Sequence, residues 1–569
     1  MRQHPICSMC QQWQPSERHS GDIWHRGKIN RKAGAARDTN PAGGTETFAP
    51  AQQSDIMRHL SLRADGLSGG IIPLLILLNL CITIPLAAIL NIWIDEAFSL
   101  HTSGGGLAYA ASHALNFEMQ PPLYFVLLNL WRSVNASPFF ARLFSIICIA
   151  LTIPLVGKIS KRFFKDIDPG WIAASVALNP FVIWAAVEIR IYALVLLLSS
   201  LLLLCFYDGY LSDTPKRSSQ WLYILCAVLA LYTQYYLGFL LCANAVALVV
   251  LRRWSALRRY LVHMIVVGLC FVPLFLVVLH QVAGINASTD NARATLREGL
   301  RGTYWNVLKY VLPTGDLTWL GMLKKWVSRL GLVMVPFLVV RGWRRPDVAD
   351  RAALWASFSG VFALFVVVSV SLGEELLKLR HTAVIFLPTI LLVFSLLPAA
   401  NTKRALSCCL FVMFFFYSGA LYSTYAPLAK DGDWARVASY IMKSERPGEP
   451  IVVFRNEFVL PLTQYYTGPN KMVPIPRAPD LERYDLRSQA LQSEEEISRA
   501  LSCVPGSHER LWLVTGFIGN FRGVSIHPDI LEAFVKRYYS VIDKRSFYLS
   551  EVKLLQKNSN AMKPKSQGI

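Results

Sequence analysis

Long apolar segments recur along most of this chain, and they constrain the fold more than any other feature of the sequence. Between residues 71 and 425 they approach the length that spans a hydrocarbon core. Backbone polar groups inside a bilayer must be hydrogen-bonded within their own segment, so these runs are predicted to be helices. The chain has 569 residues, of which 53% are hydrophobic, a fraction too high for an ordinary soluble protein of this length. The sequence therefore predicts an all-α polytopic membrane protein.

Positive charge places the ends of the predicted spans. The net charge of +20 comes from Lys and Arg that cluster between apolar segments, which is typical of cytoplasmic loops and not of a nucleic-acid surface. We predict about eleven transmembrane helices, with every dense basic cluster on the cytoplasmic side. This parity requires the short apolar stretch Leu123–Trp131 to be an interfacial or re-entrant helix. The predicted spans are Ile71–Asn91, Pro138–Gly157, Gly170–Val187, Arg190–Asp208, Gln220–Gln234, Tyr236–Leu251, Leu261–His280, Trp326–Arg341, Ala352–Leu372, His381–Leu397 and Arg404–Tyr425.

The two ends of the chain differ in composition from the spans. Residues 1–70 are polar and without periodicity, and we expect a disordered cytoplasmic segment, with Met57 as an alternative start. Residues 426–556 are expected to form a small extracytoplasmic α/β domain, and residues 557–569 a disordered tail. The expected helices of that domain are Trp434–Lys443, Glu495–Leu501 and Ile530–Tyr538, and its expected strands are Ile451–Phe454, Leu511–Thr515 and Tyr548–Leu555.

An acidic pair, Asp95-Glu96, follows directly after the first predicted span. Carboxylates at the mouth of a multi-spanning protein are costly to desolvate and are therefore candidates for function. The predicted topology brings further polar groups to the same outer face, although it was derived from the basic loops alone. These groups are Glu118, Gln120, Arg142, Glu188, Arg190, Gln234, Tyr235, Arg380 and His381.

The order of these polar groups resembles the GT-C superfamily of polyprenyl-phosphate-sugar-dependent glycosyltransferases, in particular its protein mannosyltransferase and aminoarabinose transferase members. The resemblance covers most of the range Ile71–Tyr440. Gln stands at two positions, 120 and 234, where His is common in the family. The matching elements are Asp95-Glu96, Glu118–Tyr124 (family Asp-x-His-Pro-Pro-Leu-Tyr), Glu188–Tyr192 (Glu-x-Arg-x-Tyr), Thr233–Tyr235 (Thr-His-Tyr), Arg380-His381 followed by Pro388, and Lys430–Trp434.

The resemblance implies transfer of a hexosyl or pentosyl group from a polyprenyl-phosphate donor, with inversion. Such a transfer needs a base for the acceptor hydroxyl and cations for the leaving phosphate. We assign Asp95 as the base, Glu96 as its electrostatic neighbour or a second acceptor ligand, and Arg190 and Arg380 as phosphate ligands, because the guanidinium fork matches phosphate oxygens. The remaining predicted substrate-binding residues are Glu118, Gln120, Tyr124, Glu188, Tyr192, Gln234, Tyr235 and His381.

Structural interpretations of the same residues remain open. Asp95 and Glu96 also fit the hydrated end of a span. Glu188 and Arg190 fit structural ion pairs, and Gln234 with Tyr235 fits an interfacial aromatic belt. His381 fits a polar group at a helix end better than a ligand.

No tightly bound metal or other cofactor is expected. Gln at positions 120 and 234 is a poor transition-metal ligand, although oxygens of Asp95, Glu96 and Glu118 suit Mg²⁺ or Ca²⁺. The expected partners are the lipid-linked donor, a glycan, lipid or protein acceptor, and membrane lipids, with no nucleic acid. The expected location is the inner (plasma) membrane, with the site facing the periplasm. Two other classes stay open: an O-antigen ligase or polymerase, and a polytopic lipid or solute transporter, although no internal repeat of the transporter kind is seen.

Overall fold

The computed structural model describes residues 51–288, 295–342, 348–372, 378–397, 402–482, 486–504, 508–516 and 525–558. The region Leu67–Ile569 forms one compact unit, and the account below concerns that unit. It contains a helical domain up to Tyr425 and a sheet domain after it.

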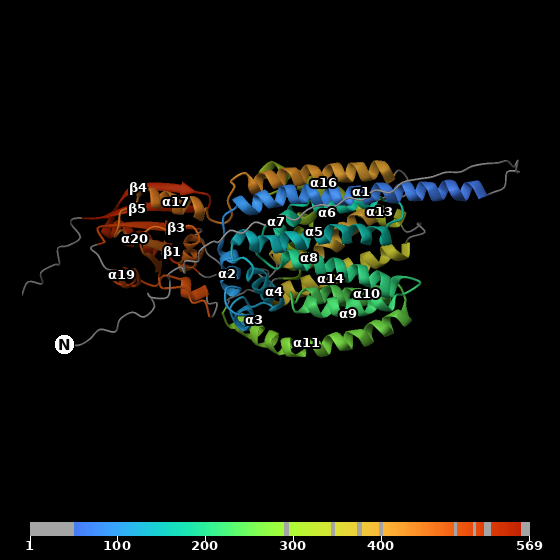
Figure 1. Ribbon diagram of the computed structural model, residues 1–569, viewed down its shortest axis with the longest axis horizontal. Helices are drawn as coiled ribbons and strands as arrows, with labels where there is room; N and C mark the ends of the chain where they lie inside the picture. The colour runs from blue at the N-terminus through green and yellow to red at the C-terminus, as the bar shows by residue number, and fades with distance from the viewer. Residues whose placement is uncertain are drawn as a thin grey trace, which may run out of the picture. The chain divides into compact units, whose positions relative to one another are not determined.

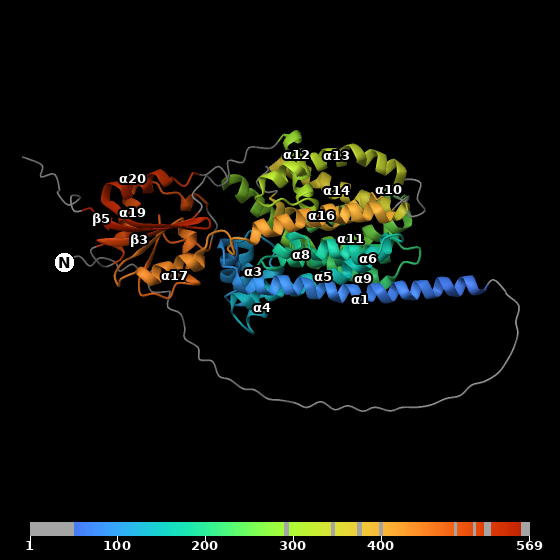
Figure 2. The ribbon, with the colours of Figure 1, turned by 90° about the horizontal axis from the view of Figure 1, so that it is seen from above.

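The helical domain consists of long helices that run side by side with shorter ones between them (Figures 1 and 2). Its hydrophobic core extends through most of these helices. The helices are α1 (Ala51–Ile89), α2 (Ile94–Thr102), α3 (Leu107–Asn116), α4 (Leu123–Arg132), α5 (Pro138–Phe163), α6 (Pro169–Ala177), α7 (Pro180–Ala186), α8 (Tyr192–Phe206) with η2 (Tyr207–Leu211), α9 (Arg217–Leu231), α10 (Leu237–Val250), α11 (Trp254–Ser288), α12 (Leu296–Val311), α13 (Thr318–Gly342), α14 (Val348–Leu372), η4 (Leu379–Ile385) with α15 (Phe386–Ser395), and α16 (Thr402–Tyr425).

Each segment predicted to span the membrane is helical. Within the described residues, six helices are long and apolar enough to cross a bilayer, or seven if the bent pair α6–α7 is one span. Helices α4, α9, α10 and η4–α15 are apolar but shorter. The polytopic helical class is thus confirmed, while the number of about eleven spans stays a prediction.

Helix α11 shows why this domain needs lipid around it. Only 11% of its most apolar window is buried against the protein. Leu261, Ile265, Leu269 and Leu276 are each at least half exposed on it. An apolar surface of that extent is unfavourable in water. A bilayer would cover it.

The break between α6 and α7 follows from a local sequence signal. The two helices meet at an angle of 59°. Asn179 precedes Pro180, and a residue before proline is disfavoured in helical conformation. The Asn179 side chain accepts a hydrogen bond from the Phe181 N–H and donates to the Tyr310 carbonyl and the Tyr417 hydroxyl. These bonds attach the bend to α12 and α16.

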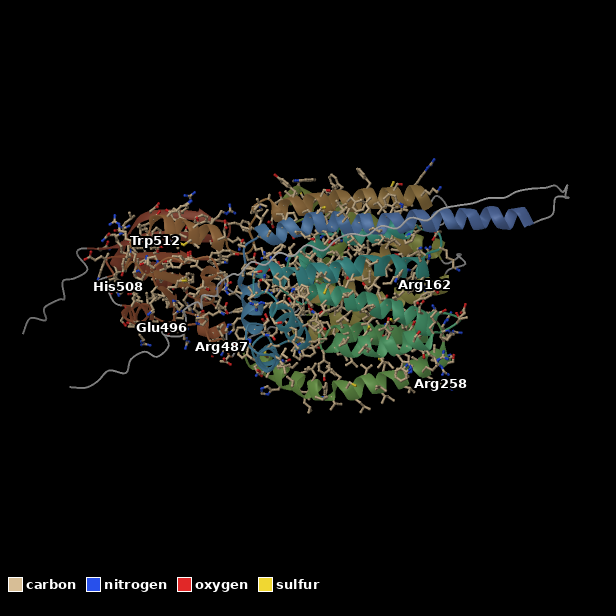
Figure 3. All side chains as sticks on the ribbon, in the orientation of Figure 1. Arg162, Arg258, Arg487, Glu496, His508 and Trp512 are labelled. Carbon is tan, nitrogen blue, oxygen red and sulfur yellow. The ribbon has the colours of Figure 1, made fainter. Side chains whose placement is uncertain are left out.

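The basic loops gather at one end of the helices. Arg162, at the end of α5, pairs with Asp208 in η2 at 2.9 Å. Arg351 at the start of α14 pairs with Asp166, also at 2.9 Å. Figure 3 shows Arg162 and Arg258 at this same end. The basic clusters that contain Arg162 and Arg258 therefore lie at one end of the helices, and the side of the membrane they face stays a prediction.

The sheet domain contains a mixed five-stranded sheet in the order β2-β1-β3-β5-β4. β1 pairs in parallel with β2 and with β3, whereas β5 pairs antiparallel with β3 and β4. The strands are β1 (Ile451–Phe454), β2 (Met472–Ile475), β3 (Arg510–Thr515), β4 (Tyr539–Phe547) and β5 (Ser550–Lys557). The helices are α17 (Trp434–Ser444), α18 (Val459–Thr463), α19 (Glu494–Ser502) and α20 (Pro528–Tyr538), with η5 (Asn456–Phe458) and η6 (Leu486–Gln489).

Helices cover both faces of this sheet. Trp434 and Val437 of α17 pack against Val453 on one face, and Ile497 of α19 with Leu531 of α20 packs on the other. Figure 2 shows α17 on one side of the strands and α19 with α20 on the opposite side. The small α/β domain expected from the sequence is therefore present.

Some local expectations were wrong or incomplete. Residues 51–70, expected to be disordered, belong to α1, because this stretch holds many helix-forming residues and continues into the first span. The predicted disorder of residues 1–50 and 559–569 lies outside the described residues. Strands β2 and β4 were not predicted, and neither was α12, whose polar composition hid a helix that begins with a Thr295–Glu298 capping box.

Candidate active site

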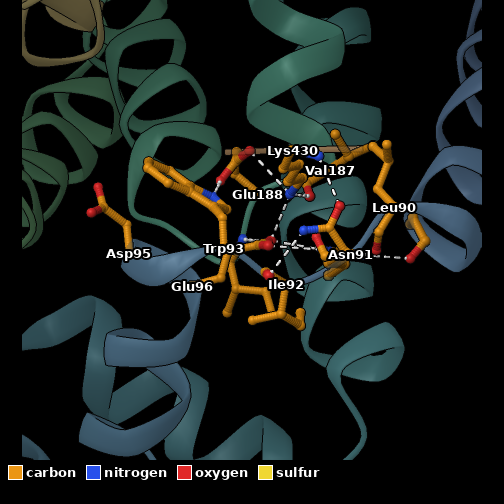
Figure 4. Close-up of polar contacts among 12 residues, drawn as sticks. Leu90, Asn91, Ile92, Trp93, Asp95, Glu96, Val187, Glu188 and Lys430 are labelled. Atoms are coloured by element: carbon orange, nitrogen blue, oxygen red, sulfur yellow. Dashed lines mark hydrogen bonds and ion pairs between the residues drawn. The ribbon is translucent and has the colours of Figure 1, made fainter. Parts of the chain in front are cut away.

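Asp95 and Glu96 occupy the first turn of α2, where carboxylates are favoured by the partial positive charge of a helix N-terminus. Successive residues of a helix point about 100° apart, so the two carboxylates face different surroundings. Figure 4 shows the Asp95 side chain directed away from the contacts made by Glu96. The side chain of Asp95 is 17% exposed and that of Glu96 is 0% exposed.

Glu96 is bound on all sides by donors. Arg142 donates to both of its carboxylate oxygens, at 3.0 and 2.7 Å. Lys430 lies 2.8 Å from Oε1, and the Ile189 N–H donates to the same oxygen at 3.0 Å. Burial opposes ionisation, but Arg142 and then Lys430 lower the pKa of Glu96. Of the two roles expected for Glu96, this geometry favours the electrostatic neighbour over the acceptor ligand.

Lys430 connects Glu96 to a second buried carboxylate. Its ammonium lies 3.0 Å from Glu188 Oε1 and donates to the Val187 carbonyl at 2.9 Å. Trp93 donates its indole N–H to the other Glu188 oxygen at 2.7 Å. Figure 4 shows Glu96, Glu188, Trp93 and Lys430 together. We name Glu96, Arg142, Glu188 and Lys430 the buried ion cluster. Glu188 thus fits the structural ion pair that the sequence left open.

Arg142 also fixes the end of α1. Beyond its pair with Glu96, its guanidinium donates to the carbonyls of Ala87, Leu90 and Asn91 at 2.7 to 3.0 Å. These bonds satisfy carbonyls that the last turn of a helix leaves without partners. The sequence analysis did not give Arg142 or Lys430 a role. A signal existed for Arg142, because an Arg among the apolar residues at the start of α5 implies a nearby acidic partner.

Asp95 pairs with Arg380, which precedes α15 in the short helix η4. The Arg380 guanidinium lies over the Trp93 ring, 5.6 Å from its centroid. Its Nε is buried and has no hydrogen-bond partner among the described residues. The sequence predicted that Asp95 and Arg380 share a site although 285 residues separate them, and the structure brings them into contact.

Arg190 lies beside this pair. It donates to Glu118 at 2.8 Å, to the Ser99 hydroxyl at 2.9 Å and to the Asp95 carbonyl at 3.2 Å. Its Nε, like that of Arg380, is buried without a partner in the described part of the chain. Two guanidinium groups with unused donors therefore flank Asp95.

The other predicted substrate-binding residues lie in different environments. Tyr192 is buried beside Arg190 and Arg380. Gln120, Tyr124 and Gln234 each hold a buried oxygen for which the described residues supply no partner. The Leu123 N–H donates to the Tyr232 carbonyl at 3.0 Å, so the turns that carry Gln120 and Gln234 meet. Tyr235 donates to Gln281 at 2.9 Å, and His381 is half-buried within η4.

Two further carboxyls near Asp95 were missed by the sequence analysis. Burial raises the pKa of Asp431, and the charge of Asp95 raises this pKa further, whereas the charge of Arg380 lowers it. Burial also raises the pKa of Glu457 to about 7; Arg455 opposes this shift and Asp95 adds to it. Asp431 stood in the recognised element Lys430–Trp434, whereas nothing in the sequence marked Glu457.

Within the described residues, no group of three or more His, Cys, Asp and Glu side chains is arranged to hold a metal ion. Two of the carboxylates suggested as ligands of a hard cation are already paired with guanidinium groups. Glu96 pairs with Arg142, and Glu118 pairs with Arg190. The expectation of no tightly bound metal stays a prediction.

The comparisons with known proteins agree with this architecture. No protein-family model matches the chain, and no curated protein matches it. Among solved structures, ArnT from Cupriavidus metallidurans in the apo state is similar, with a TM-score of 0.52 at 15% identity over 85% of this chain and 98% of that one. The same protein bound to undecaprenyl phosphate gives a TM-score of 0.50 at 14% identity, over 87% and 99% of the two chains. This likeness shows a common fold over about 85% of this chain and nearly all of the ArnT chain.

Proposed function

We propose that this chain, whose fold is that of the GT-C superfamily, is an integral-membrane glycosyltransferase that takes its sugar from a polyprenyl-phosphate donor. The likeness to ArnT supports the proposal, since one of its structures contains undecaprenyl phosphate. The observation that carries it is the arrangement of Asp95 between Arg380 and Arg190. A carboxylate with partial access to solvent and two guanidinium groups with unused donors provide a base and an anion site.

The proposed reaction assigns one task to each side chain. Arg380 and Arg190 bind the donor phosphate through their Nε donors and stabilise the charge that grows as the sugar leaves. Because Arg380 pairs with Asp95, a phosphate that draws Arg380 away leaves the Asp95 carboxylate free to bind the acceptor hydroxyl. Asp95 then takes the proton of an acceptor hydroxyl. The hydroxyl oxygen bonds to the anomeric carbon, the bond from that carbon to the phosphate oxygen breaks, and polyprenyl phosphate departs with inversion.

We propose that the buried ion cluster supports the arrangement of Asp95, Arg380 and Arg190. Arg142 and Lys430 supply two positive charges beside the Glu96 and Glu188 carboxyls, although burial raises the pKa of Glu188 to about 7 against the charge of Lys430. The cluster joins α2, α5, the turn before α8 and the loop after α16. Catalytic groups must be held within a fraction of an ångström, and we propose that this cluster does so for Asp95.

The proposed location is the inner membrane, with Asp95 at the periplasmic surface. The basic loops lie at the opposite end of the helices, as the charge bias of cytoplasmic loops requires. Glycan, lipid and protein hydroxyls are all chemically suitable acceptors.

A transfer assay separates this function from transport. Purified protein in proteoliposomes receives undecaprenyl-phosphate sugars labelled in the sugar, together with a bacterial envelope extract as acceptor. Transfer of label to extract components, with release of undecaprenyl phosphate, is expected. Movement of the lipid-linked sugar across the bilayer without release of undecaprenyl phosphate would instead identify a transporter.

A further inference from the structure

The strand β1 ends at a special position in the sheet. It lies between β2 and β3, and all three strands are parallel. In open parallel sheets, ligands bind beyond the carboxyl end of the strand at which the chain changes direction across the sheet. The segment Arg455–Glu457 occupies that position, directly after β1.

This segment carries buried polar groups in an unusual backbone conformation. Arg455 has a φ of 58°, a left-handed conformation that non-glycine residues rarely adopt and that concentrates at functional sites. Asn456 is 1% exposed, and its Oδ1 has no hydrogen-bond partner among the described residues. A buried amide oxygen without a partner costs about 1–3 kcal/mol unless a ligand or water supplies a donor.

Glu457 and Gln489 complete the cluster. The Gln489 amide donates to Glu457 Oε1, and Arg455 donates to Gln489 Oε1 at 3.3 Å. Arg455 also lies 3.6 Å from the Glu457 carboxylate. The cluster therefore holds a carboxyl, two amides and a guanidinium, and none of the proposed catalytic steps uses them.

Contacts with the helical domain place α18, which follows Glu457 in the chain, against α2, which carries Asp95. Tyr465 lies just after α18, and Ile92 lies two residues before α2. The Tyr465 hydroxyl accepts a hydrogen bond from the Ile92 N–H at 2.6 Å. Leu460 of α18 belongs to the hydrophobic core of the helical domain. The charge of Asp95 also raises the pKa of Glu457, after the larger effect of burial.

We propose that Arg455, Asn456, Glu457 and Gln489 form an acceptor subsite that binds the hydroxyl groups of a glycan acceptor beside Asp95. Each sugar hydroxyl both donates and accepts one or more hydrogen bonds. The Asn456 oxygen accepts, Arg455 donates, and the carboxyl of Glu457 accepts when ionised and donates when protonated. Such a mixture of donors and acceptors suits adjacent hydroxyls better than a phosphate or an apolar chain.

This inference rests on the proposed function, but binding tests it without turnover. Saturation-transfer NMR would be recorded on the full chain in detergent with the methyl glycosides of glucose, galactose, mannose and N-acetylglucosamine as probes. The variants are Asn456→Ala and Glu457→Gln. Glu532→Gln, on an exposed position of α20, is the matched control. Undecaprenyl phosphate binding, measured on the same samples, reports that the helical domain is intact.

We expect at least one glycoside to bind the wild type and the Glu532→Gln control. Its affinity should fall about tenfold or more in Asn456→Ala and Glu457→Gln, the loss expected when a buried hydrogen-bonding group is removed, while undecaprenyl phosphate binding stays the same. Equal glycoside binding in all four proteins would overturn the subsite, and so would binding of none of the glycosides to wild type. Glycoside binding that depends on Asn456 in a protein that transfers no sugar would leave the subsite standing and refute the proposed function.

Discussion

Asp95 and Glu96 are adjacent in the chain, yet only Asp95 is accessible. The Glu96 carboxylate accepts four short contacts from Arg142, Lys430 and the Ile189 N–H, while Asp95 pairs with Arg380 at a partly exposed surface. One helical turn therefore carries a structural carboxylate and a candidate base. The difference arises from the direction in which each side chain leaves α2.

The buried ion cluster should matter for stability more than for chemistry. Arg142→Met removes the cation that neutralises Glu96 and releases three carbonyls of the α1 end. Removing one partner of a buried pair typically costs about 3–5 kcal/mol, so the amount of folded protein in the membrane should fall sharply. Arg162→Met is the control, because the side chain of Arg162 is 43% exposed in its pair with Asp208, and exposed pairs contribute at most about 1 kcal/mol. Similar thermal stability of the two variants in detergent would contradict this assignment.

Arg190 should contribute to donor use through the shape of its guanidinium. Arg190→Lys keeps the charge near Glu118 but loses the planar fork that matches phosphate oxygens. The kcat/KM for the lipid-linked donor should fall about tenfold to a hundredfold, the range of one or two charge-assisted hydrogen bonds, with membrane abundance unchanged. An unchanged kcat/KM for the donor would assign Arg190 to the ion pair with Glu118 alone.

Glu457 predicts a pH dependence of stability. Its pKa in the folded protein is about 7, above the value of 4.5 for a free carboxyl. A raised pKa gives a stability contribution that is fully present below pH 4.5 and is lost progressively up to pH 7, on the order of 3 kcal/mol in total. In Glu457→Gln this loss should disappear. Melting curves of wild type and Glu457→Gln at pH 5 and pH 8 measure this loss of stability. An equal change of melting temperature with pH in the two proteins would contradict the raised pKa of Glu457.

The orientation of the chain can be tested with fusions. If the active-site end faces the periplasm, a C-terminal alkaline phosphatase should be active and a C-terminal green fluorescent protein dark. Fusions placed after Arg253, in the basic turn before α11, should give the reverse pattern. Fluorescence from the C-terminal fusion would place Asp95 in the cytoplasm and remove the basis for a periplasmic reaction.

The sequence predicted the class of fold because hydrophobic runs and basic loops are local signals. It also predicted that Asp95, Arg190 and Arg380 share a site. The recognised elements and the predicted topology both indicated this, and neither requires knowledge of contacts between side chains. It assigned Asp95 as the base but left two roles open for Glu96, because the buried partners of Glu96 are not visible in the sequence. Lys430 was part of a recognised element, but its contacts with Glu96 and Glu188 join segments hundreds of residues apart.

The sheet domain shows the same limit. β1 was predicted with its observed bounds because four buried apolar residues mark it, whereas β4 carries exposed polar residues along most of its length and was missed. Glu457 could not be found as a candidate, since its importance depends on burial and on the neighbouring charge of Asp95.

The central claim is that Asp95 is the base of a sugar transfer, and turnover of Asp95→Asn per molecule of inserted protein tests it most directly. The substitution keeps size and hydrogen-bonding capacity but removes the proton acceptor. Wild type, Asp95→Asn and the exposed-site control Glu532→Gln would be compared in the labelled donor assay. We predict a loss of about a hundredfold or more for Asp95→Asn alone, with undecaprenyl phosphate binding retained. Near-normal turnover at normal abundance would contradict the account and move the search for the base to Asp431 or Glu457.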